Sequence, residues 1–434
     1  MKVPVVVVGA GACGLVAALA ARDAGADVLV LERDATPSGS TALSSGFIPA
    51  CATRYQRAAG VEDSPECMAT DVQRKNHGQA DARLVEALCR ASGPAIEWLA
   101  DAHGLAFELV QGFLYPGHSA LRMHAMPEKT GAALMAALLG AASRAGVDIL
   151  ASARVTEIHP DVRIQRPDGS PETLERDAVV LACSGFGGNP GMVRRYLPEI
   201  AGAPYFGHAG NQGDAIRWGE ALGGALGGMG AYQGHGSVAL PQNILITWAL
   251  MMEGGIQVNA DGRRFSNEHL GYSEQCLPVL EQPGGCAWCI YDERLHCLGM
   301  AFPDYQEAHK AGAIKPVPSL PDLPRTLEDV EGYADGARDP FGRDFTTKPK
   351  MKPPYYGVKV TGALFHTQGG LRVDAQARVL DRAGRPLAGL FAGGGAACGL
   401  SGDHVWGYLS GNGLLSALVL GRLAGESAAR LVLA

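Results

Sequence analysis

The chain has 434 residues, of which 59 are glycine, 6% are aromatic and 19% are charged. This length suggests about two or three domains, and a hydrophobic content of 47% suffices for a large core and excludes a disordered chain. The net charge of −7 argues against a nucleic-acid binder that works by neutralising phosphates. Glycine has roughly twice its usual share of about 7%, so the fold must contain many turns or close backbone contacts.

The opening residues carry no visible targeting signal. The apolar run at 5–8 is too short for a signal peptide, and no stretch reaches the roughly 18 apolar residues of a membrane span. The cysteines are scattered and several stand among small apolar residues, which is typical of reduced, buried thiols. We therefore expect a cytoplasmic protein without a membrane span.

The first predicted elements form a strand–helix–strand unit of about 30 residues. Residues 3–8 are a buried strand, an Ala- and Leu-rich helix covers about 15–24, and a second strand ends at Glu32. The turn before the helix carries the glycines of a G-x-G-x-x-G motif, which are Gly9, Gly11 and Gly14. These glycines suit a tight turn, close approach of a pyrophosphate and close helix–strand packing, and the acidic residue can bind ribose hydroxyls. The unit therefore predicts a dinucleotide site.

Helical patterns follow around 79–103 and 129–145, and a hairpin is predicted over 154–177 before a buried strand at 179–183. From about 205 to 355 proline becomes dense and the alternation of strands and helices is lost, which indicates an inserted domain. From about 356 the glycine-rich strands return, and the chain ends in a predicted helix. The last stretch therefore completes the first domain.

Further glycine-rich segments favour FAD over NAD as the dinucleotide. The small-residue run Gly39–Gly46 can wrap a planar ring system closely, and the clusters at 211–214 and 391–395 are also rich in glycine. Several dispersed clusters fit one long, extended cofactor better than a short one.

Eight segments in order resemble the FAD-dependent family of fumarate reductase and succinate dehydrogenase flavoproteins, soluble fumarate and urocanate reductases, and 3-ketosteroid Δ1-dehydrogenases. This likeness implies an α/β fold in which a Rossmann-like FAD-binding domain, 1–205 and 356–434, is split by an α+β capping domain, 206–355. The matching segments are VVVVGAGACGLVAALAARDAGADVLVLER (5–33), GSTALSSG (39–46), LACSGFGGN (181–189), GNQGDAIRWGEALG (210–223), GGIQVNADGRRFSNE (254–268), PPYYGVKV (353–360), HTQGGLRVD (366–374) and SGNGLLSALVLGRLAG (410–425).

The resemblance also implies a set of FAD-binding residues. Relatives with covalent flavin carry a histidine in the segment at 39–46, which this chain lacks, so we expect FAD to be bound non-covalently. Many relatives have glutamate where this chain has Gly395, so a hydrogen bond to the ribityl chain is lost there or supplied by another group. The cofactor residues implied are Gly9, Gly11, Cys13, Gly14, Glu32, Arg33, Ser40, Thr41, Ser44, Ser45, Gly46, Val155, Ala182, Ser184, Gly185, Asn189, Asp214, Gly394, Gly395, Ser410, Gly413 and Leu414.

Likeness to fumarate reductases implies a carboxylate site that is incomplete here. His366 and the following threonine stand where those enzymes bind a substrate carboxylate, and His404 matches a neighbouring histidine. Arg294 lies near the position of the proton-delivering arginine. Where those enzymes have the last arginine of the carboxylate site, this chain has Tyr408. Where they have the arginine of the proton relay, it has Gly271.

Likeness to ketosteroid dehydrogenases implies a different chemistry. The cap motif Arg264-Phe-Ser-Asn-Glu-His-Leu-Gly-Tyr272 places Tyr272 on the tyrosine that removes a proton beside the hydride-donating carbon. Gly411 aligns with a glycine amide that holds the ketone, and Tyr408 lies one residue out of register with its partner tyrosine. A hydroxyl and a backbone N–H form an oxyanion hole for an enolate, which favours a ketone. His366 and Arg294 can still bind a carboxylate elsewhere on the substrate, for example on a cyclic oxo-acid.

Other chemistry-bearing residues have simpler interpretations. Arg122 and His124 either line the site, as this region does in relatives, or only begin a helix. Cys286 and Cys289 have a C-x-x-C spacing, but they lie in a strand-like run where residues three apart face opposite ways, so we expect no metal.

The sequence thus predicts an FAD-dependent dehydrogenase that introduces an α,β double bond into a cyclic or steroid-like ketone, by α-proton abstraction and β-hydride transfer to flavin N5, with an external electron acceptor. The predicted catalytic residues are Tyr272, Tyr408, Gly411, Arg294 and His366. Two alternatives stay open. One is a fumarate-reductase-like enoate reductase, and the other is a flavoprotein subunit of an electron-transfer complex. The oligomeric state is not predicted.

Overall fold

The computed structural model describes residues 2–434, and its largest element is an eight-stranded sheet. β1 pairs in parallel with both β2 and β9, and three of its valines, Val5–Val7, are fully buried. A parallel strand that is covered on both faces needs apolar residues at every position, which explains the four consecutive valines of β1. The strands of this sheet are β1 (Lys2–Val8), β2 (Val28–Leu31), β6 (Asp148–Leu150), β7 (Arg154–Glu157), β8 (Val162–Gln165), β9 (Pro171–Leu181), β17 (Arg378–Leu380) and β18 (Pro386–Ala392).

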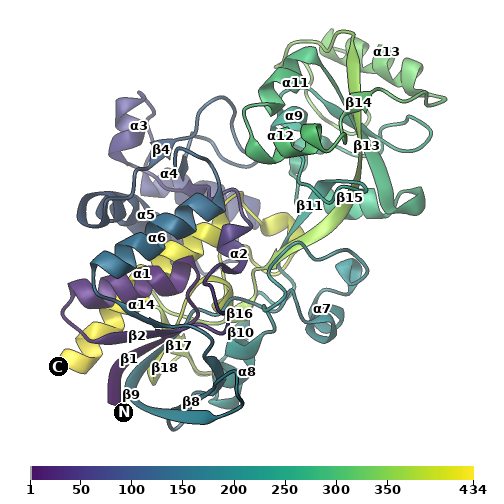
Figure 1. Cartoon of the computed structure of the whole chain (residues 1–434). Coiled ribbons are helices and arrows are strands. Elements are labelled where there is room, and N and C mark those ends of the chain that lie inside the picture. Colours follow the sequence, from purple (N-terminus) through teal and green to yellow (C-terminus); the bar gives the residue numbers. More distant parts are fainter. Residues whose placement is uncertain (1) are drawn as a thin grey trace.

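The two ends of the chain build this sheet and its helical layer together. β18, near the C-terminus, pairs in parallel with β9, and α14 packs against α1 (Figure 1). A Cβ added at Gly421 would lie 2.5 Å from the carbonyl oxygen of Cys13, and one at Gly425 would lie 2.1 Å from that of Ala17. The glycines therefore allow direct contact of two helix backbones. The helices of this part are α1 (Ala12–Asp23), α2 (Gly39–Ala42), α3 (Arg54–Ala58), α4 (Pro65–Lys75), α5 (Ala82–His103), α6 (Gly131–Arg144), α7 (Pro190–Tyr196), α8 (Asp214–Ala221) and α14 (Asn412–Leu433).

The green elements of Figure 1 form a separate lobe, which we call the cap. Its core is an antiparallel sheet in the order β11-β15-β13-β12, with β14 paired to β15. The elements of the cap are β11 (Tyr232–Ala239), β12 (Ile256–Val258), β13 (Cys286–Asp292), β14 (Lys315–Pro316), β15 (Tyr355–Thr367), α9 (Ala249–Met252), α10 (Cys276–Leu280), α11 (Glu293–Gly299), α12 (Pro303–Lys310) and α13 (Leu323–Ala334).

The predicted α/β fold with a parallel sheet is confirmed. The hairpin predicted over 154–177 and the strand predicted at 179–183 are organised differently, since β9 is one long strand that pairs with β8 in its first half and with β1 in its second. The predicted boundaries at 205 and 355 stay predictions, and strand pairing with the cap begins at β11 and runs along the whole of β15.

Two small sheets complete the strands. One is β3 (Ile48–Pro49), β4 (Glu108–Leu109) and β5 (Met123–Ala125), and the other is β10 (Leu226–Gly227) with β16 (Gly370–Leu371). Among residues 2–434, no helix combines the length and the apolar character that crossing a bilayer requires.

Candidate functional site

A cavity of about 320 Å³ lies where the ends of β1 and β2 meet the cap. Its lining comes from the turn after β1, the α2 segment, the loop at 206–214, the start of α14 and several cap residues. The carboxyl ends of parallel strands are the usual place for a ligand in an open α/β sheet. The cavity is therefore the candidate active site.

The turn between β1 and α1 depends on glycine at two positions. Gly9 has a φ of +103°, and a Cβ added to it would lie 2.7 Å from the carbonyl oxygen of Ala182. A Cβ on Gly14 would lie 1.8 Å from the carbonyl oxygen of Gly9. Gly11 has no side chain to cap the helix that begins after it. Apart from the amide of Ala12, the N–H groups of this helix end suit a pyrophosphate.

The carboxylate of Glu32 is fixed at the end of β2. It accepts a hydrogen bond of 2.8 Å from the amide of Ala10 and one of 2.9 Å from the amide of Asp34. Arg33 donates to the carbonyl oxygen of Gly210 at 3.0 Å, which ties the 206–214 loop to this strand end. The held carboxylate can accept from ribose hydroxyls, as the motif predicts.

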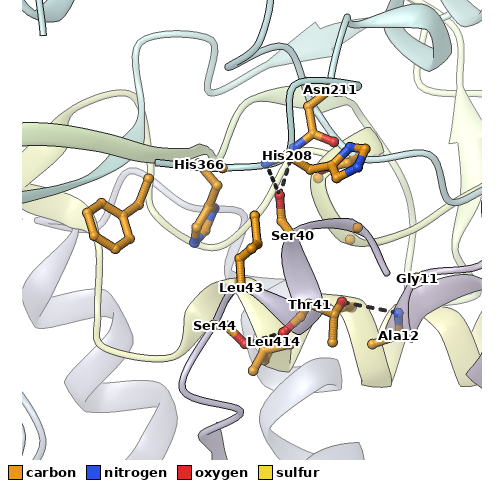
Figure 2. Close-up of a pocket in the computed structure, with 18 of the residues that line it drawn as sticks. Gly11, Ala12, Ser40, Thr41, Leu43, Ser44, His208, Asn211, His366 and Leu414 are labelled. Carbon is orange, nitrogen blue, oxygen red and sulfur yellow. Dashed lines mark hydrogen bonds between the residues drawn. The ribbon is translucent and has the colours of Figure 1, made fainter. Parts of the chain in front are cut away.

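The α2 segment connects the start of α1 with the 206–214 loop (Figure 2). The hydroxyl of Ser40 accepts from the backbone amide of His208 at 3.1 Å and from the side-chain amide of Asn211 at 2.8 Å. The hydroxyl of Thr41 accepts from the backbone amide of Ala12 at 3.2 Å. Small residues in this segment therefore hold two walls of the cavity together.

Most of the predicted cofactor residues line this one cavity. Those that line it are Gly9, Gly11, Cys13, Glu32, Arg33, Ser40, Thr41, Ser44, Ser45, Gly46, Val155, Ala182, Ser184, Asp214, Gly394, Gly395, Ser410, Gly413 and Leu414.

Three predicted cofactor residues lie behind the lining instead. Gly14 serves helix packing, and a Cβ on Gly185 would lie 2.1 Å from the hydroxyl of Thr367. Asn189 caps α7, and its side-chain amide donates to the carbonyl oxygen of Gln212 at 3.0 Å. These residues support the shape of the cavity from outside it.

An unsatisfied polar group supports the fit of a polar, extended cofactor. Ser416 lines the cavity near the start of α14, and its hydroxyl is buried without a hydrogen-bond partner among residues 2–434. Buried hydroxyls are normally paired. The start of α14 therefore offers a polar group to a ligand, and together with the pyrophosphate turn and Glu32 it fits FAD.

Four of the five predicted catalytic residues come together at the cap end of the cavity. The rings of Tyr272 and Tyr408 lie 6.1 Å apart, and the ring of His366 lies 5.5 Å from that of Tyr408. Gly411 also lines this end and precedes the first residue of α14 with a φ of +85°. A side chain at that position would be strained.

Burial keeps both phenols protonated at neutral pH. It raises the pKa of Tyr408 to about 12, although hydrogen bonding from the amides of Gly411 and Gly413 and from Tyr272 opposes the rise. Burial and the neighbouring Tyr408 raise the pKa of Tyr272 well above its ordinary value.

The histidines at this end are neutral. Burial lowers the pKa of His366 to about 4, and its Nδ1 accepts from the side chain of Gln368 at 2.9 Å. Burial also lowers the pKa of His235, to about 3, and its ring stacks on Tyr272 at 4.7 Å. Neither ring supplies a positive charge for a substrate carboxylate at pH 7.

Arg294, the fifth predicted catalytic residue, lies outside the cavity. It stands in the first turn of α11, is exposed, and donates to the carbonyl oxygen of Glu253 at 2.8 Å. The local helix start directs this side chain to the neighbouring end of α9. His404 also lies outside, on the surface, where its ring stacks on Trp406 at 4.8 Å.

Arg122 and His124 belong to the protein interior rather than to the cavity lining. The guanidinium of Arg122 is fully buried and forms a two-pronged ion pair with Asp63 at 2.7 and 2.8 Å, together with an ion pair to Asp71. His124 lies 2.8 Å from the hydroxyl of Thr53. Both side chains therefore hold elements of the first lobe together.

The pair Cys286 and Cys289 lies on β13 as expected. The Sγ of Cys286 contacts the carbonyl oxygen of Pro283, whereas that of Cys289 is buried beside Ser237 and Gln257. Within residues 2–434, no group of three or more His, Cys, Asp or Glu side chains is placed to hold a metal ion.

Several lining residues escaped the sequence interpretation. These are Tyr115, His235, Trp248, Phe302 and Asp304. They come from a loop of the first lobe, from β11, from segments beside α9 and α12, and from the first turn of α12. For Tyr115, Trp248 and Phe302 the one available signal is that aromatic side chains are rare in this chain, whereas His235 and Asp304 have none.

Known proteins of similar sequence and structure support this interpretation. Probable fumarate reductase Ifc3 from Shewanella frigidimarina is 29% identical over 442 residues, which cover 98% of this chain and 74% of the relative. The open conformation of a flavocytochrome c3 fumarate reductase has a TM-score of 0.82 and 28% identity, covering 100% of this chain and 79% of that one.

A 3-ketosteroid-Δ4-(5α)-dehydrogenase from Rhodococcus jostii RHA1, in complex with 4-androstene-3,17-dione, has a TM-score of 0.78 and 28% identity, covering 99% of this chain and 97% of that one. A family model described as an FAD binding domain matches residues 4–414. The chain therefore belongs to the FAD-binding domain family of flavin-dependent oxidoreductases, and FAD is its cofactor.

Proposed function

We propose that this protein is an FAD-dependent dehydrogenase that introduces a double bond between the α and β carbons of a cyclic or steroid-like ketone. At a coarser level it is a flavin-dependent oxidoreductase that acts on CH–CH or C=C bonds. The observation that carries the finer proposal is that Tyr272, Tyr408 and Gly411 lie together at the cap end of the cavity. A hydroxyl and a backbone N–H at one place suit a ketone oxygen.

The charges around this end also favour a neutral carbonyl over a dicarboxylate. The cationic side chains among the described lining residues are Arg33 and Arg154, which lie beside the ribose-binding Glu32 and Val155. The cap end has neutral histidines and no arginine or lysine within residues 2–434. A dicarboxylate would have to leave water without a cationic partner, which is costly.

The protein groups divide the work as follows. Glu32, the free amides of α1 and the start of α14 would hold FAD, which when bound accepts or returns a hydride. The hydroxyl of Tyr408 and the amide of Gly411 donate to the carbonyl oxygen and make the α proton more acidic. Tyr272 takes that proton as its phenolate, and its high pKa makes the phenolate a strong base. The same groups serve the reverse reaction, with Tyr272 as the acid.

Enoate reduction of the fumarate reductase type is the second candidate. The relatives named fumarate reductases and the position of His366 in the cavity favour it. The placement of Arg294 outside the cavity and the tyrosine at 408 count against it. Oxidation of a reduced dye by fumarate, in the purified holoenzyme, would support this candidate.

The experiment for the leading proposal is a screen of ring ketones against the purified holoenzyme under anaerobic conditions, with an external dye as electron acceptor. We expect at least one ring ketone to bleach the flavin and Tyr272→Phe to suppress the bleaching. If no ketone bleaches the flavin and fumarate reoxidises it rapidly, the ketone assignment is wrong.

A further inference from the structure

One acidic side chain in the substrate end of the cavity has no use in the reaction described above. Asp304 lines the cavity from the first turn of α12. Among residues 2–434, its carboxylate forms no hydrogen bond or ion pair with another side chain, and it does not cap α12, which begins at Pro303. It is the only lining residue of the cap within the described chain that carries a formal charge at neutral pH.

The surroundings of Asp304 are aromatic. Phe302, two residues earlier, packs edge-on against Phe113 at 5.8 Å and belongs to an apolar cluster with Phe47 and Tyr115. Burial, with a smaller contribution from Glu307, raises the pKa of the Asp304 carboxyl above its ordinary value. A carboxylate beside apolar rings has lost part of its hydration and gains from a donor that replaces it.

A role in the helix alone does not account for this position. An acidic residue in a first turn stabilises a helix by about 0.3–1 kcal/mol whether or not it faces a cavity. Such a residue does better in water, where its charge costs nothing to solvate. The place of Asp304 in the cavity lining therefore needs a second reason.

We propose that Asp304 binds a hydrogen-bond donor, a hydroxyl or a protonated amine, on the part of the substrate remote from the reacting carbonyl. This inference rests on the proposed function for the carbonyl itself, which lies at Tyr408 and Gly411. The proposed substrate therefore has a neutral ketone at one end and a hydrogen-bond donor at the other. It also excludes a carboxylate at the remote end.

The test measures binding rather than turnover. Four cyclohexanones are used that differ only opposite the carbonyl, where they carry isobutyl, hydroxymethyl, protonated dimethylaminomethyl or carboxylate groups. Their dissociation constants are measured from changes in flavin absorbance in the holoenzyme, in Asp304→Asn and in Glu307→Gln. Glu307 is the control because it is exposed, lies on the same helix and does not line the cavity.

We expect Asp304→Asn to raise the dissociation constant of the ketone with the protonated amine by about tenfold, which corresponds to the loss of one charge-assisted hydrogen bond. The isobutyl ketone should change by less than about twofold, and the carboxylate should bind more tightly. Glu307→Gln should leave all four constants within about twofold. Equal changes for all four ligands, or none, would overturn the inference, as would a wild-type preference for the carboxylate.

The same data separate this inference from the proposed function. If Asp304→Asn weakens binding of the amine and tightens binding of the carboxylate but no ketone bleaches the flavin, the dehydrogenase assignment fails and the role of Asp304 stands. If ketones are oxidised without any charge pattern, the role of Asp304 fails and the assignment stands. If no ring ketone perturbs the flavin in any variant, both are wrong.

Discussion

Replacing Tyr272 by phenylalanine should remove both most of the activity and its dependence on pH. A phenol with a pKa of about 12, as at Tyr408, is ionised in roughly one molecule in 10⁴ at pH 8. The pKa of Tyr272 is also raised well above its ordinary value, so its phenolate is rare at neutral pH as well. A reaction that needs this phenolate should therefore speed up about tenfold for each pH unit between 7 and 10.

The assay is the rate of flavin reduction by a ring ketone, followed by anaerobic stopped-flow absorbance at each pH. Such ketones do not ionise in this range, so any slope belongs to the protein. Tyr272→Phe should lower the rate by about 10²–10⁴ and leave a flat profile. Tyr408→Phe is the matched control, because loss of one donor to the carbonyl should cost about 10²–10³ but keep the slope.

Two results would refute this assignment of roles. A flat wild-type profile would mean that no buried phenol acts as the base. A slope that survives in Tyr272→Phe and disappears in Tyr408→Phe would exchange the two roles, since burial raises the pKa of both phenols.

Further outcomes follow from the cofactor site and the interior. Glu32→Gln should raise the dissociation constant of FAD about tenfold in fluorescence titrations, because an amide offers one acceptor where the carboxylate offers two. Acid precipitation should release all flavin into the supernatant, and a pellet that stays yellow would contradict non-covalent binding. Arg122→Met should cost about 3–5 kcal/mol of unfolding free energy at pH 7. Burial raises the pKa of Asp71, but hydrogen bonds from Ser119 and Arg122 outweigh burial and lower it. The ion pair of Arg122 with Asp71 therefore stabilises the fold above the ordinary pKa of Asp71, and this stabilisation is lost as the pH falls through the lowered pKa. Chemical denaturation at pH 7 and at a pH below the lowered pKa of Asp71 should therefore show a smaller Arg122→Met deficit at the lower pH.

The cofactor end was accessible to sequence reasoning because its signals are local. Gly9, Gly14 and Glu32 lie within one strand–helix–strand unit, where their spacing in the sequence alone determines which of these residues lie close together in the fold. The clash distances at both glycines agree with the roles that the motif predicts. The one local error was the division of β9 into two elements, since its polar first half and apolar second half differ only in whether the faces are covered.

The substrate end was less accessible because its residues converge from distant segments. The resemblance to known enzymes predicted that Tyr272 and Tyr408 lie in the site, but it also predicted Arg294 there. The start of α11 instead directs the Arg294 side chain toward the carbonyl oxygen of Glu253. His235 and Asp304 had no motif at all. Their position depends on how the cap sheet lies over the first lobe, which no local pattern encodes.

The contact between α1 and α14 has a consequence for the order in which the protein can form on the ribosome. β1 and its helix are synthesised first, but β18 and α14 emerge only after the entire cap has been made. Until then one edge of β9 has no partner and the face of α1 that α14 will cover is bare, which invites pairing with other chains. The cap, whose strands are contiguous within residues 232–367, can close its own sheet earlier. The cavity, which needs the start of α14, can therefore form only after α14 has been made.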